Sequence, residues 1–278
     1  MNLQHVRGLA LDLDGTIYRG NMAIPGAVEA VEQLLAAGVR IVYLSNNATQ
    51  SRQEVVQRLH NLGLAATVDT VLTGTSLAAS YARLHAGGQR ALAIGEAGLL
   101  TELRLAGVDF VPAGEAVTDV DSFGLVIVGG DYHFSYTKLT QALHALQGDA
   151  MLLATDADAT FPAADGLKPG TGAILASIER VSGKTAVVAA KPSLFAATQA
   201  CAALKLSPHE CLAVGDRLDS DIALGEHLGG AALLLTGVTS RSSFKDEPLA
   251  NCLIYSSLHE LATELISAKK VKKPLAKR

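Results

Sequence analysis

The stretch GLALDLDGT at residues 8–16 decides the fold, because an apolar run passes directly into two carboxylates, Asp12 and Asp14. In an extended strand, alternate side chains point to the same side, so these two acids leave the backbone facing one way. Neighbouring carboxylates repel each other unless a cation or a proton separates their charges. The pair therefore predicts a metal ion at the end of a strand.

Two other interpretations of this pair are a calcium-binding loop and a simple turn. An EF-hand loop that began at Asp12 would need Gly at its sixth position and Glu at its twelfth, where the chain has Ile17 and Ala23. That comparison excludes the calcium loop. The turn stays open for the pentapeptide alone, because Gly15 suits a turn that closes a strand.

The composition limits the classes of protein to which the chain can belong. It has 278 residues, of which 49% are hydrophobic and 4% aromatic, so it can form one large or two smaller domains of helices packed on strands. The net charge of −4 argues against nucleic-acid binding through a basic face. The three cysteines lack CxxC spacing and are expected to be reduced, buried thiols.

Targeting and membrane signals are not found in the sequence. No apolar run reaches the ~18 residues of a membrane helix, and the start of the chain lacks the pattern of a secretory signal. We therefore expect a cytoplasmic protein with no membrane partner. Residues 269–278 are basic and are expected to form a flexible tail.

Short apolar strands alternate with amphipathic helices along the whole chain. This order predicts parallel sheets with right-handed crossovers. The predicted strands lie at residues 9–13, 39–44, 68–73, 91–94, 108–111, 125–128, 151–154, 186–190, 212–214, 232–235 and 253–255. Helices are expected between Gly26 and Gly38, from a capping box at Ser51 and Glu54 to Leu62, and near residues 76–85, 99–105, 136–146 and 171–181.

Polar motifs follow strands of the first and last parts of this series, whereas the strands between them end without such motifs. We therefore expect an α/β core with a Rossmann-like parallel sheet, made of residues 1–74 and 185–268. A second α/β domain, residues 75–184, is expected to be inserted into it.

Two of these polar motifs are suited to binding anions. Ser45, Asn46 and Asn47 follow a strand, and a hydroxyl with successive backbone N–H groups could hold phosphate oxygens there. Lys191 follows the strand at 186–190 and could neutralise an anion as a point charge. For each motif alone an ordinary alternative stays open, a polar turn for the first and an exposed lysine before a helix for the second.

A third motif is acidic. Asp216 follows the strand at 212–214 and is succeeded by Asp219 and Asp221. Such acids could hold a hard cation, but they are also common at helix N-termini, where they cap backbone N–H groups. Asp219 in particular can be a first-turn charge.

Taken together, the order Asp-x-Asp-Gly-Thr at 12–16, Ser-Asn at 45–46, Lys-Pro at 191–192 and Gly-Asp-x-x-x-x-Asp at 215–221 resembles the haloacid dehalogenase-like phosphohydrolases. The inserted domain resembles the C2 cap of the subfamily with NagD-type, phosphoglycolate and pyridoxal-phosphate phosphatases, to which the segment PGTG at 169–172 is also similar. The resemblance extends over nearly the whole chain except the basic tail.

This resemblance implies a Mg²⁺-dependent phosphatase and a role for each acid. Asp12 is the nucleophile that becomes an aspartyl phosphate, and Asp14 is the acid and base that protonates the leaving oxygen and then activates water. Mg²⁺ is expected on Asp12, on the backbone carbonyl of Asp14 and on Asp216, with Asp221 as a further acid of the metal site.

The remaining implied roles concern the phosphoryl group. Ser45 and the backbone at Asn46 and Asn47 are expected to bind its oxygens, and Lys191 to offset charge on the nucleophile and phosphate. Thr16 is expected to form a hydrogen bond beside the nucleophile.

The cap is expected to select the substrate through the stretch TDADATFP at 155–162, with Asp156 and Phe161 as binding residues. Relatives often have Asn where this chain has Asp156, and the pyridoxal-phosphate branch tends to have His near Phe161. The acids of this stretch can equally be turn residues. The expected substrate is a small phosphorylated metabolite such as phosphoglycolate, glycerol or sugar phosphate, or a nucleoside monophosphate.

Two alternative functions stay open at this point. The same groups could pass phosphate to an acceptor other than water, as in a phosphotransferase. The chain could also be a catalytically silent binding protein that kept the fold. Relatives with a C2 cap often dimerise through it, so a homodimer is a further expectation.

Overall fold

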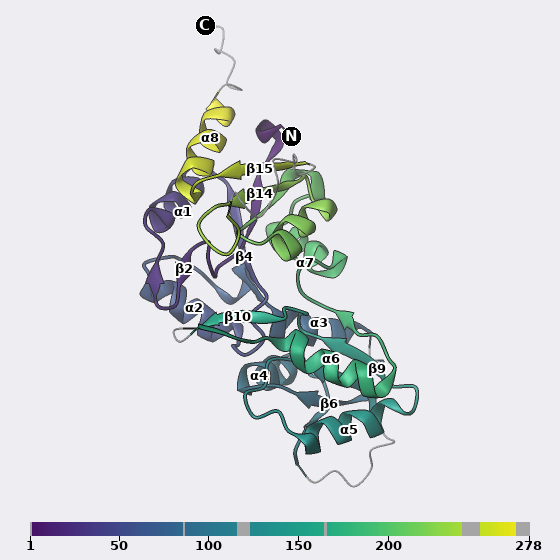
Figure 1. Ribbon diagram of the computed structural model, residues 1–278. Coiled ribbons are helices and arrows are strands. Elements are labelled where there is room, and N and C mark those ends of the chain that lie inside the picture. The colour runs from purple at the N-terminus through teal and green to yellow at the C-terminus, as the bar shows by residue number, and fades with distance from the viewer. Residues whose placement is uncertain (1, 86, 116–122, 164–165, 241–250, 271–278) are drawn as a thin grey trace, which may run out of the picture. The chain divides into compact units, whose positions relative to one another are not determined.

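The fold is built on two β-sheets whose pairs of neighbouring strands are mostly parallel (Figure 1). The computed structural model describes residues 2–85, 87–115, 123–163, 166–240 and 251–270. The chain divides into two units, each with a sheet of its own. The first unit contains Met1–Ser45, Val56–Val71 and Ala196–Arg278, and the second contains Asn46–Val55 and Leu72–Phe195.

The six-stranded sheet has its first strand near the middle. Its order is β15 (Cys252–Tyr255), β14 (Ala231–Leu234), β13 (Cys211–Gly215), β1 (Gly8–Leu11), β4 (Arg40–Ser45) and β5 (Val71–Thr73). The pairs from β15 to β4 are parallel. All four residues of β1 are buried, as expected for a strand covered on both faces, which explains its uninterrupted apolar sequence.

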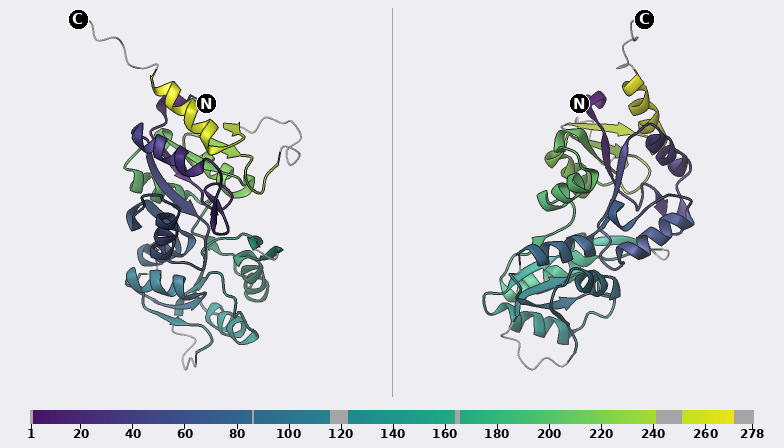
Figure 2. Two further views of the ribbon diagram at one scale, coloured as in Figure 1. Left: turned by 90° about the vertical axis from the view of Figure 1, so that its left-hand side faces the viewer. Right: turned by 180° about the vertical axis from the view of Figure 1, so that it is seen from behind.

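Helices flank this sheet, and the helix that follows its last strand in the sequence was not predicted. They are α1 (Ala27–Ala36), α2 (Arg52–Asn61), α7 (Leu194–Leu204) and α8 (Leu258–Lys270). Helix α8 packs against α1, so two helices from opposite ends of the described chain lie side by side (Figures 1 and 2). The capping box at the start of α2 is confirmed, because Ser51 N donates to Glu54 Oε2 at 2.7 Å and Glu54 N donates to Ser51 Oγ at 3.4 Å.

The second unit combines a five-stranded sheet with helices. The order of this sheet is β12 (Val187–Val188), β9 (Met151–Ala154), β8 (Phe123–Val128), β6 (Arg90–Ile94) and β7 (Phe110–Pro112), all parallel. The helices are α3 (Gly74–His85), α4 (Ala97–Leu105), α5 (Tyr136–Leu146) and α6 (Thr171–Ser182). Leu92, Val126 and Leu152 form an apolar core with residues of α5 and α6, and alternate positions such as Leu125 and Leu153 are buried on the other face.

Two short hairpins and several single turns complete the described chain. The hairpins pair β2 (Tyr18–Arg19) with β3 (Met22–Ala23), and β10 (Thr160–Ala163) with β11 (Gly166–Pro169), in antiparallel fashion. Single helical turns lie at Leu3–His5, Val68–Thr70, Pro208–Glu210, Leu218–Ile222 and Gly225–His227. The sequence did not predict the hairpins, because strands of two to four residues give too short a pattern.

The predicted fold class, a parallel-sheet α/β core with a second α/β unit, is confirmed. One strand was assigned to the wrong sheet: the run at 186–190 forms only the two-residue β12, and it pairs with β9 in the five-stranded sheet. The strand expected at 68–73 begins as a helical turn, and β5 covers only its second half. The division into a core and a substrate-selecting cap stays a prediction.

The end of the chain also differs in part from the expectation. Lys269 and Lys270, assigned to the flexible tail, are the last residues of α8. The rest of the predicted tail, residues 271–278, lies outside the described residues. None of the described helices combines the length and the apolar character that spanning a bilayer requires.

Candidate active site

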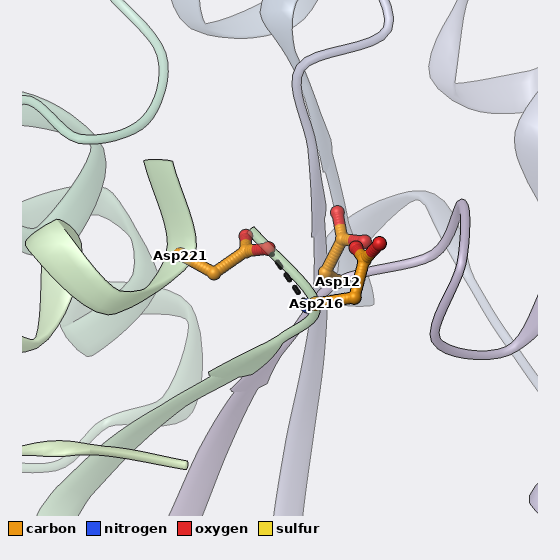
Figure 3. Close-up of side chains that lie close together, drawn as sticks. All are labelled: Asp12, Asp216 and Asp221. Carbon is orange, nitrogen blue, oxygen red and sulfur yellow. Dashed lines mark hydrogen bonds between the residues drawn. The ribbon is translucent and has the colours of Figure 1, made fainter. Parts of the chain in front are cut away.

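The carboxyl edge of the six-stranded sheet brings together acids that are far apart in the sequence. Asp12 directly follows β1, and Asp216 directly follows β13, its parallel neighbour. The Asp12 backbone continues this pairing, since its N–H donates to the carbonyl of Val214 at 2.8 Å. The two carboxylates therefore lie side by side at the end of the strands (Figure 3).

Asp221 joins these two acids from the wide helical turn at Leu218–Ile222. One carboxylate oxygen from each of Asp12, Asp216 and Asp221 lies within 4.8 Å of the others. All three side chains are buried, with exposed fractions of 7%, 0% and 1%. Three anions gathered out of water repel one another strongly, and oxygen donors in such an arrangement suit a hard divalent cation.

Asp221 also shapes the turn that carries Asp216. Its Oδ2 accepts a hydrogen bond from the backbone N–H of Asp216 at 3.1 Å (Figure 3). It also accepts one from the backbone N–H of Arg217 at 3.1 Å. Asp221 lies inside the turn and both N–H groups belong to residues that precede it, so this contact is not the helix-capping bond that the sequence left open. The residue therefore has a structural contact as well as a place in the acidic group.

Glycines leave the space that the Asp216 carboxylate occupies. A Cβ atom added at Gly237 would overlap this carboxylate, and one at Gly15 would lie 2.5 Å from its Oδ2. Gly15 has φ of +86°, in the left-handed region that favours glycine. The N–H of Val238 donates to Asp216 Oδ2, and Thr236 Oγ1 donates to the carbonyl of Gly15 at 2.7 Å.

The loop at 236–239 is thus part of the site, although the sequence reasoning missed it. A signal was present: a Thr-Gly pair follows the apolar run of β14, and β14 neighbours β13, so its end faces the same edge.

Asp14 differs from the other acids in being exposed. Its backbone forms an isolated β-bridge with that of Tyr18. The Tyr18 carbonyl accepts a hydrogen bond from Gly15 N at 2.8 Å. Burial raises the pKa of the Tyr18 phenol, and the negative charge of Asp14 raises it further. The guanidinium of Arg58 lies over the Tyr18 ring, 4.6 Å from its centroid. Asp14 therefore lies at the rim of the acidic group, in contact with solvent.

Two hydroxyls predicted for the site are buried in the first unit. Ser45 is 3% exposed at the end of β4, and Thr16 is 1% exposed. Among the described residues Thr16 Oγ1 has no hydrogen-bond partner. The expected hydrogen bond of Thr16 beside the nucleophile is therefore not present in the described structure.

In the second unit, Asn46 and Lys191 are joined at the level of the backbone. Lys191 N donates to Asn46 Oδ1 at 3.0 Å, and Asn46 Nδ2 donates to the Lys191 carbonyl at 3.2 Å. The same Nδ2 donates to Asp158 Oδ1 at 3.3 Å. Lys191 itself is only 4% exposed, so the alternative of a solvated lysine before a helix is wrong.

The Asn47 side chain holds a turn. Its Oδ1 accepts hydrogen bonds from Thr49 N at 3.0 Å and Gln50 N at 2.8 Å, and its Nδ2 donates to Gln50 Oε1 at 3.0 Å. These contacts give the side chain a turn-forming role, which was the ordinary alternative. The backbone N–H of Asn47 is the group that is predicted to bind a phosphoryl oxygen.

The two predicted cap residues have different surroundings. Asp156 is 2% exposed, and its carboxylate accepts hydrogen bonds from Thr155 Oγ1 at 2.9 Å and Asp158 N at 3.0 Å. Burial, joined by the negative charge of Asp158, raises the pKa of Asp156 to about 7. Phe161 is partly exposed on β10, with its ring 6.3 Å from that of Tyr132, a residue that the sequence reasoning did not single out.

Comparison with known proteins gives consistent matches along the chain. A family described as haloacid dehalogenase-like hydrolase matches residues 9–109, and one described as HAD-hydrolase-like matches residues 188–261. Sugar-phosphatase AraL of Bacillus subtilis is 36% identical over 232 residues, 83% of each chain.

Solved structures agree with these matches. The p-nitrophenyl phosphatase from Archaeoglobus fulgidus has a TM-score of 0.84 and 32% identity, over 93% of this chain and 99% of that one. NagD from E. coli K-12 has a TM-score of 0.81 and 27% identity, over 94% and 98% of the two chains.

Proposed function

Because the chain belongs to the NagD-like haloacid dehalogenase-like hydrolases, we propose that it is a Mg²⁺-dependent phosphomonoesterase that works through an aspartyl phosphate on Asp12. It is a phosphatase that acts on small phosphorylated substrates. The proposal of Mg²⁺ and an aspartyl phosphate rests on the buried group of carboxylates on Asp12, Asp216 and Asp221.

This donor set fits the proposed ion. The three carboxylates are hard oxygen ligands in one buried place, and their mutual repulsion favours binding of a divalent cation. Asp12, Asp216 and Asp221 would hold Mg²⁺, with the backbone carbonyl of Asp14 as a further ligand. When bound, the ion would offset the negative charge of the phosphoryl group that approaches these acids.

The proposed reaction has two steps, both carried by residues of the chain. A carboxylate oxygen of Asp12 attacks phosphorus, the bond from phosphorus to the leaving oxygen breaks, and Asp14 donates its proton to that oxygen. Asp14 then takes a proton from water, whose oxygen attacks phosphorus and releases inorganic phosphate and the Asp12 carboxylate. The exposure of Asp14 supports this role, because a group in contact with solvent can exchange protons with it.

We assign the binding of the phosphoryl oxygens to hydrogen-bond donors of two motifs. One motif follows the first predicted strand and the other follows the second. Thr16 supports this assignment, because its buried hydroxyl has no partner among the described residues and is available to a ligand. Ser45 and the backbone N–H groups at Asn46 and Asn47 would bind the oxygens, and Lys191 would supply the positive charge.

For the substrate we propose a sugar or glycerol phosphate, phosphoglycolate or a nucleoside monophosphate. AraL, which matches along most of the chain, is described as a sugar phosphatase. Phe161 is assigned to the leaving group, whereas the hydrogen bonds that engage both carboxylate oxygens of Asp156 favour an indirect role. A homodimer formed through the second unit and a cytoplasmic location stay predictions, and light scattering of the purified protein would test the first.

The deciding experiment is hydrolysis of p-nitrophenyl phosphate with Mg²⁺, with EDTA, and with the variant Asp12→Asn. We expect loss of activity in EDTA, recovery on adding Mg²⁺, and no turnover by Asp12→Asn. Asp149→Asn is the matched control, because Asp149 is exposed on the second unit and should leave the rate unchanged. Turnover by the folded Asp12→Asn protein would refute the nucleophile, and products formed on added alcohols would indicate phosphate transfer to acceptors other than water.

A further inference from the structure

Asp156 is a buried acid that the proposed reaction does not use. It follows β9 through Thr155 and lies beside the start of α6, where the side chain of Thr171 forms a hydrogen bond with it. Thr155 Oγ1 and Asp158 N donate to its two oxygens, so both oxygens are bound by protein groups. Because protein groups already engage both oxygens, we assign Asp156 an indirect role rather than direct contact with a substrate.

A continuous set of hydrogen bonds leads from this acid to the backbone of Lys191. Asp156 Oδ1 accepts from Asp158 N, and the Asp158 carboxylate accepts from Asn46 Nδ2. Because a carboxylate only accepts hydrogen bonds, Asn46 must present its amide nitrogen to Asp158. Its oxygen is then left for the N–H of Lys191.

Close packing fixes the loop between Asp156 and β10. Gly172 N donates to the Asp158 carbonyl at 2.9 Å, and Gly170 N donates to the Ala159 carbonyl at 2.8 Å. A Cβ atom added at either glycine would overlap backbone carbonyl oxygens of this loop. A change at the Asp156 carboxyl therefore has little room to be absorbed locally.

We propose that Asp156 is a positioning residue, which holds the backbone at Lys191 in place through Asp158 and Asn46. The proposal rests on the proposed function, because Lys191 matters for the rate only if it meets the phosphoryl group. Asp156 belongs to the second unit together with the three residues through which it acts.

The charges around Asp156 give this positioning a dependence on pH. Its carboxyl faces the negative charge of Asp158 on its own loop and the hydroxyl of Thr171 on α6, and burial raises its pKa to about 7. When neutral, Asp156 keeps the hydrogen bond to Asp158 N without repelling the Asp158 carboxylate. When ionised, it repels that carboxylate and weakens its contact with Asn46. The neutral form is therefore the one that holds Lys191.

The test compares Asp156→Asn, which imitates the neutral acid, with Asp156→Ala, which removes the contacts. For the wild type we expect kcat on p-nitrophenyl phosphate with Mg²⁺ to decline above about pH 7. Asp156→Asn should keep the neutral-pH rate and lose that decline. Asp156→Ala should lose about tenfold or more in kcat at every pH with little change in KM. Asp149→Asn should keep the wild-type profile.

A second measurement does not depend on activity. Hydrogen exchange of the Lys191 amide, corrected for the intrinsic effect of pH, should be slow in the wild type below pH 7 and in Asp156→Asn at all pH values. It should be fast in Asp156→Ala. A wild-type pH profile and wild-type exchange in both Asp156 variants would overturn the proposal. If the wild type hydrolyses no phosphate ester, the proposed function fails instead, and the exchange data alone decide the positioning role.

Discussion

Asn46 and Lys191, 145 residues apart in the sequence, are paired by two hydrogen bonds between the side-chain amide of the first and the backbone N–H and carbonyl of the second. The pair joins the second and third of the four sequence motifs inside one unit of the structure. A side-chain amide carries a donor nitrogen and an acceptor oxygen, so it can donate to a carbonyl and accept from an N–H at the same time.

The first prediction concerns this pair. Asn46→Asp keeps the size of the side chain but replaces the donating nitrogen with an oxygen that faces the Asp158 carboxylate and the Lys191 carbonyl. We expect kcat to fall by about tenfold to a hundredfold, because Lys191 loses its position. Steady-state kinetics check this result against Asn61→Asp, which changes an exposed residue at the end of α2. Equal rates for the two variants would contradict the role of the pair.

A second prediction separates the two contacts of Asp221. Asp221→Asn keeps an oxygen that can accept from the N–H groups of Asp216 and Arg217, but it removes a negative charge from the acidic group. Mg²⁺ affinity, measured by calorimetry, should fall by about tenfold to a hundredfold with little loss of stability. Asp221→Ala should in addition lose about 2 kcal/mol of the free energy of unfolding, because two N–H groups lose their acceptor. Unchanged Mg²⁺ affinity in both variants would leave Asp221 with only its hydrogen bonds to the backbone before the turn.

A third prediction tests the space around Asp216. In Gly237→Ala the added methyl group overlaps the Asp216 carboxylate, so either the loop at 236–239 or the carboxylate must shift. We expect about 1–3 kcal/mol of destabilisation and weaker Mg²⁺-dependent activity. Gly148→Ala is the control, because a Cβ atom at Gly148 would meet no other atom within 4 Å. The idea fails if both alanine variants match the wild type in thermal melting and in rate.

A fourth prediction follows from the raised pKa of Asp156. The unfolded carboxyl releases its proton near its ordinary pKa of 3.8, whereas the folded one keeps it up to about 7. Stability from this group is therefore full below pH 3.8 and is lost as the pH rises to about 7, by at most about 4 kcal/mol. Asp156→Asn removes this loss, so its stability relative to the wild type should grow between these pH values. Urea unfolding at several pH values would measure the difference, and a constant difference would contradict the pKa.

A fifth prediction concerns the start of α2. Arg52 N donates to Glu102 Oε1 at 2.7 Å, and the Arg52 guanidinium pairs with Glu102 Oε2 at 3.0 Å. Glu102 is 2% exposed, so Glu102→Ala leaves the guanidinium and an N–H without this partner. The expected cost is about 3–5 kcal/mol of unfolding free energy, which urea denaturation would measure. Glu179→Ala provides a comparison on α6, because Glu179 accepts one backbone hydrogen bond and its loss should cost about 1 kcal/mol.

Sequence reasoning located the acidic group because parallel strands impose a simple rule. Asp12 and Asp216 each come directly after an apolar strand, and neighbouring parallel strands end at one edge of a sheet. The same rule could not reveal that Asp221 binds two backbone N–H groups, because that contact depends on how the turn after β13 is wound. Nor could it reveal the role of Gly237, which lacks a side chain and so leaves space for the Asp216 carboxylate.

The error in the sheet assignment has a physical cause as well. An apolar run such as residues 186–190 says that a segment is buried, but not against which neighbour. Hydrogen bonds from Ala189 N to the Ala154 carbonyl and from Ala190 N to the Thr155 carbonyl fix it beside β9. The burial of Asp156 could not be predicted either, because an acid in a stretch rich in turn residues is expected to be exposed to solvent.

The packing of residues 157–159 against Gly170 and Gly172 has a consequence for engineering the substrate preference of this enzyme. Random mutagenesis across the whole stretch from 155 to 169 would mix changes in substrate preference with changes in rate, because Asp156 and Asp158 hold the backbone of Lys191 in place. The hairpin of β10 and β11 offers a cleaner target, since Gly166–Pro169 is exposed and Phe161 is partly so. Libraries confined to that hairpin should yield variants with new preferences that still turn over.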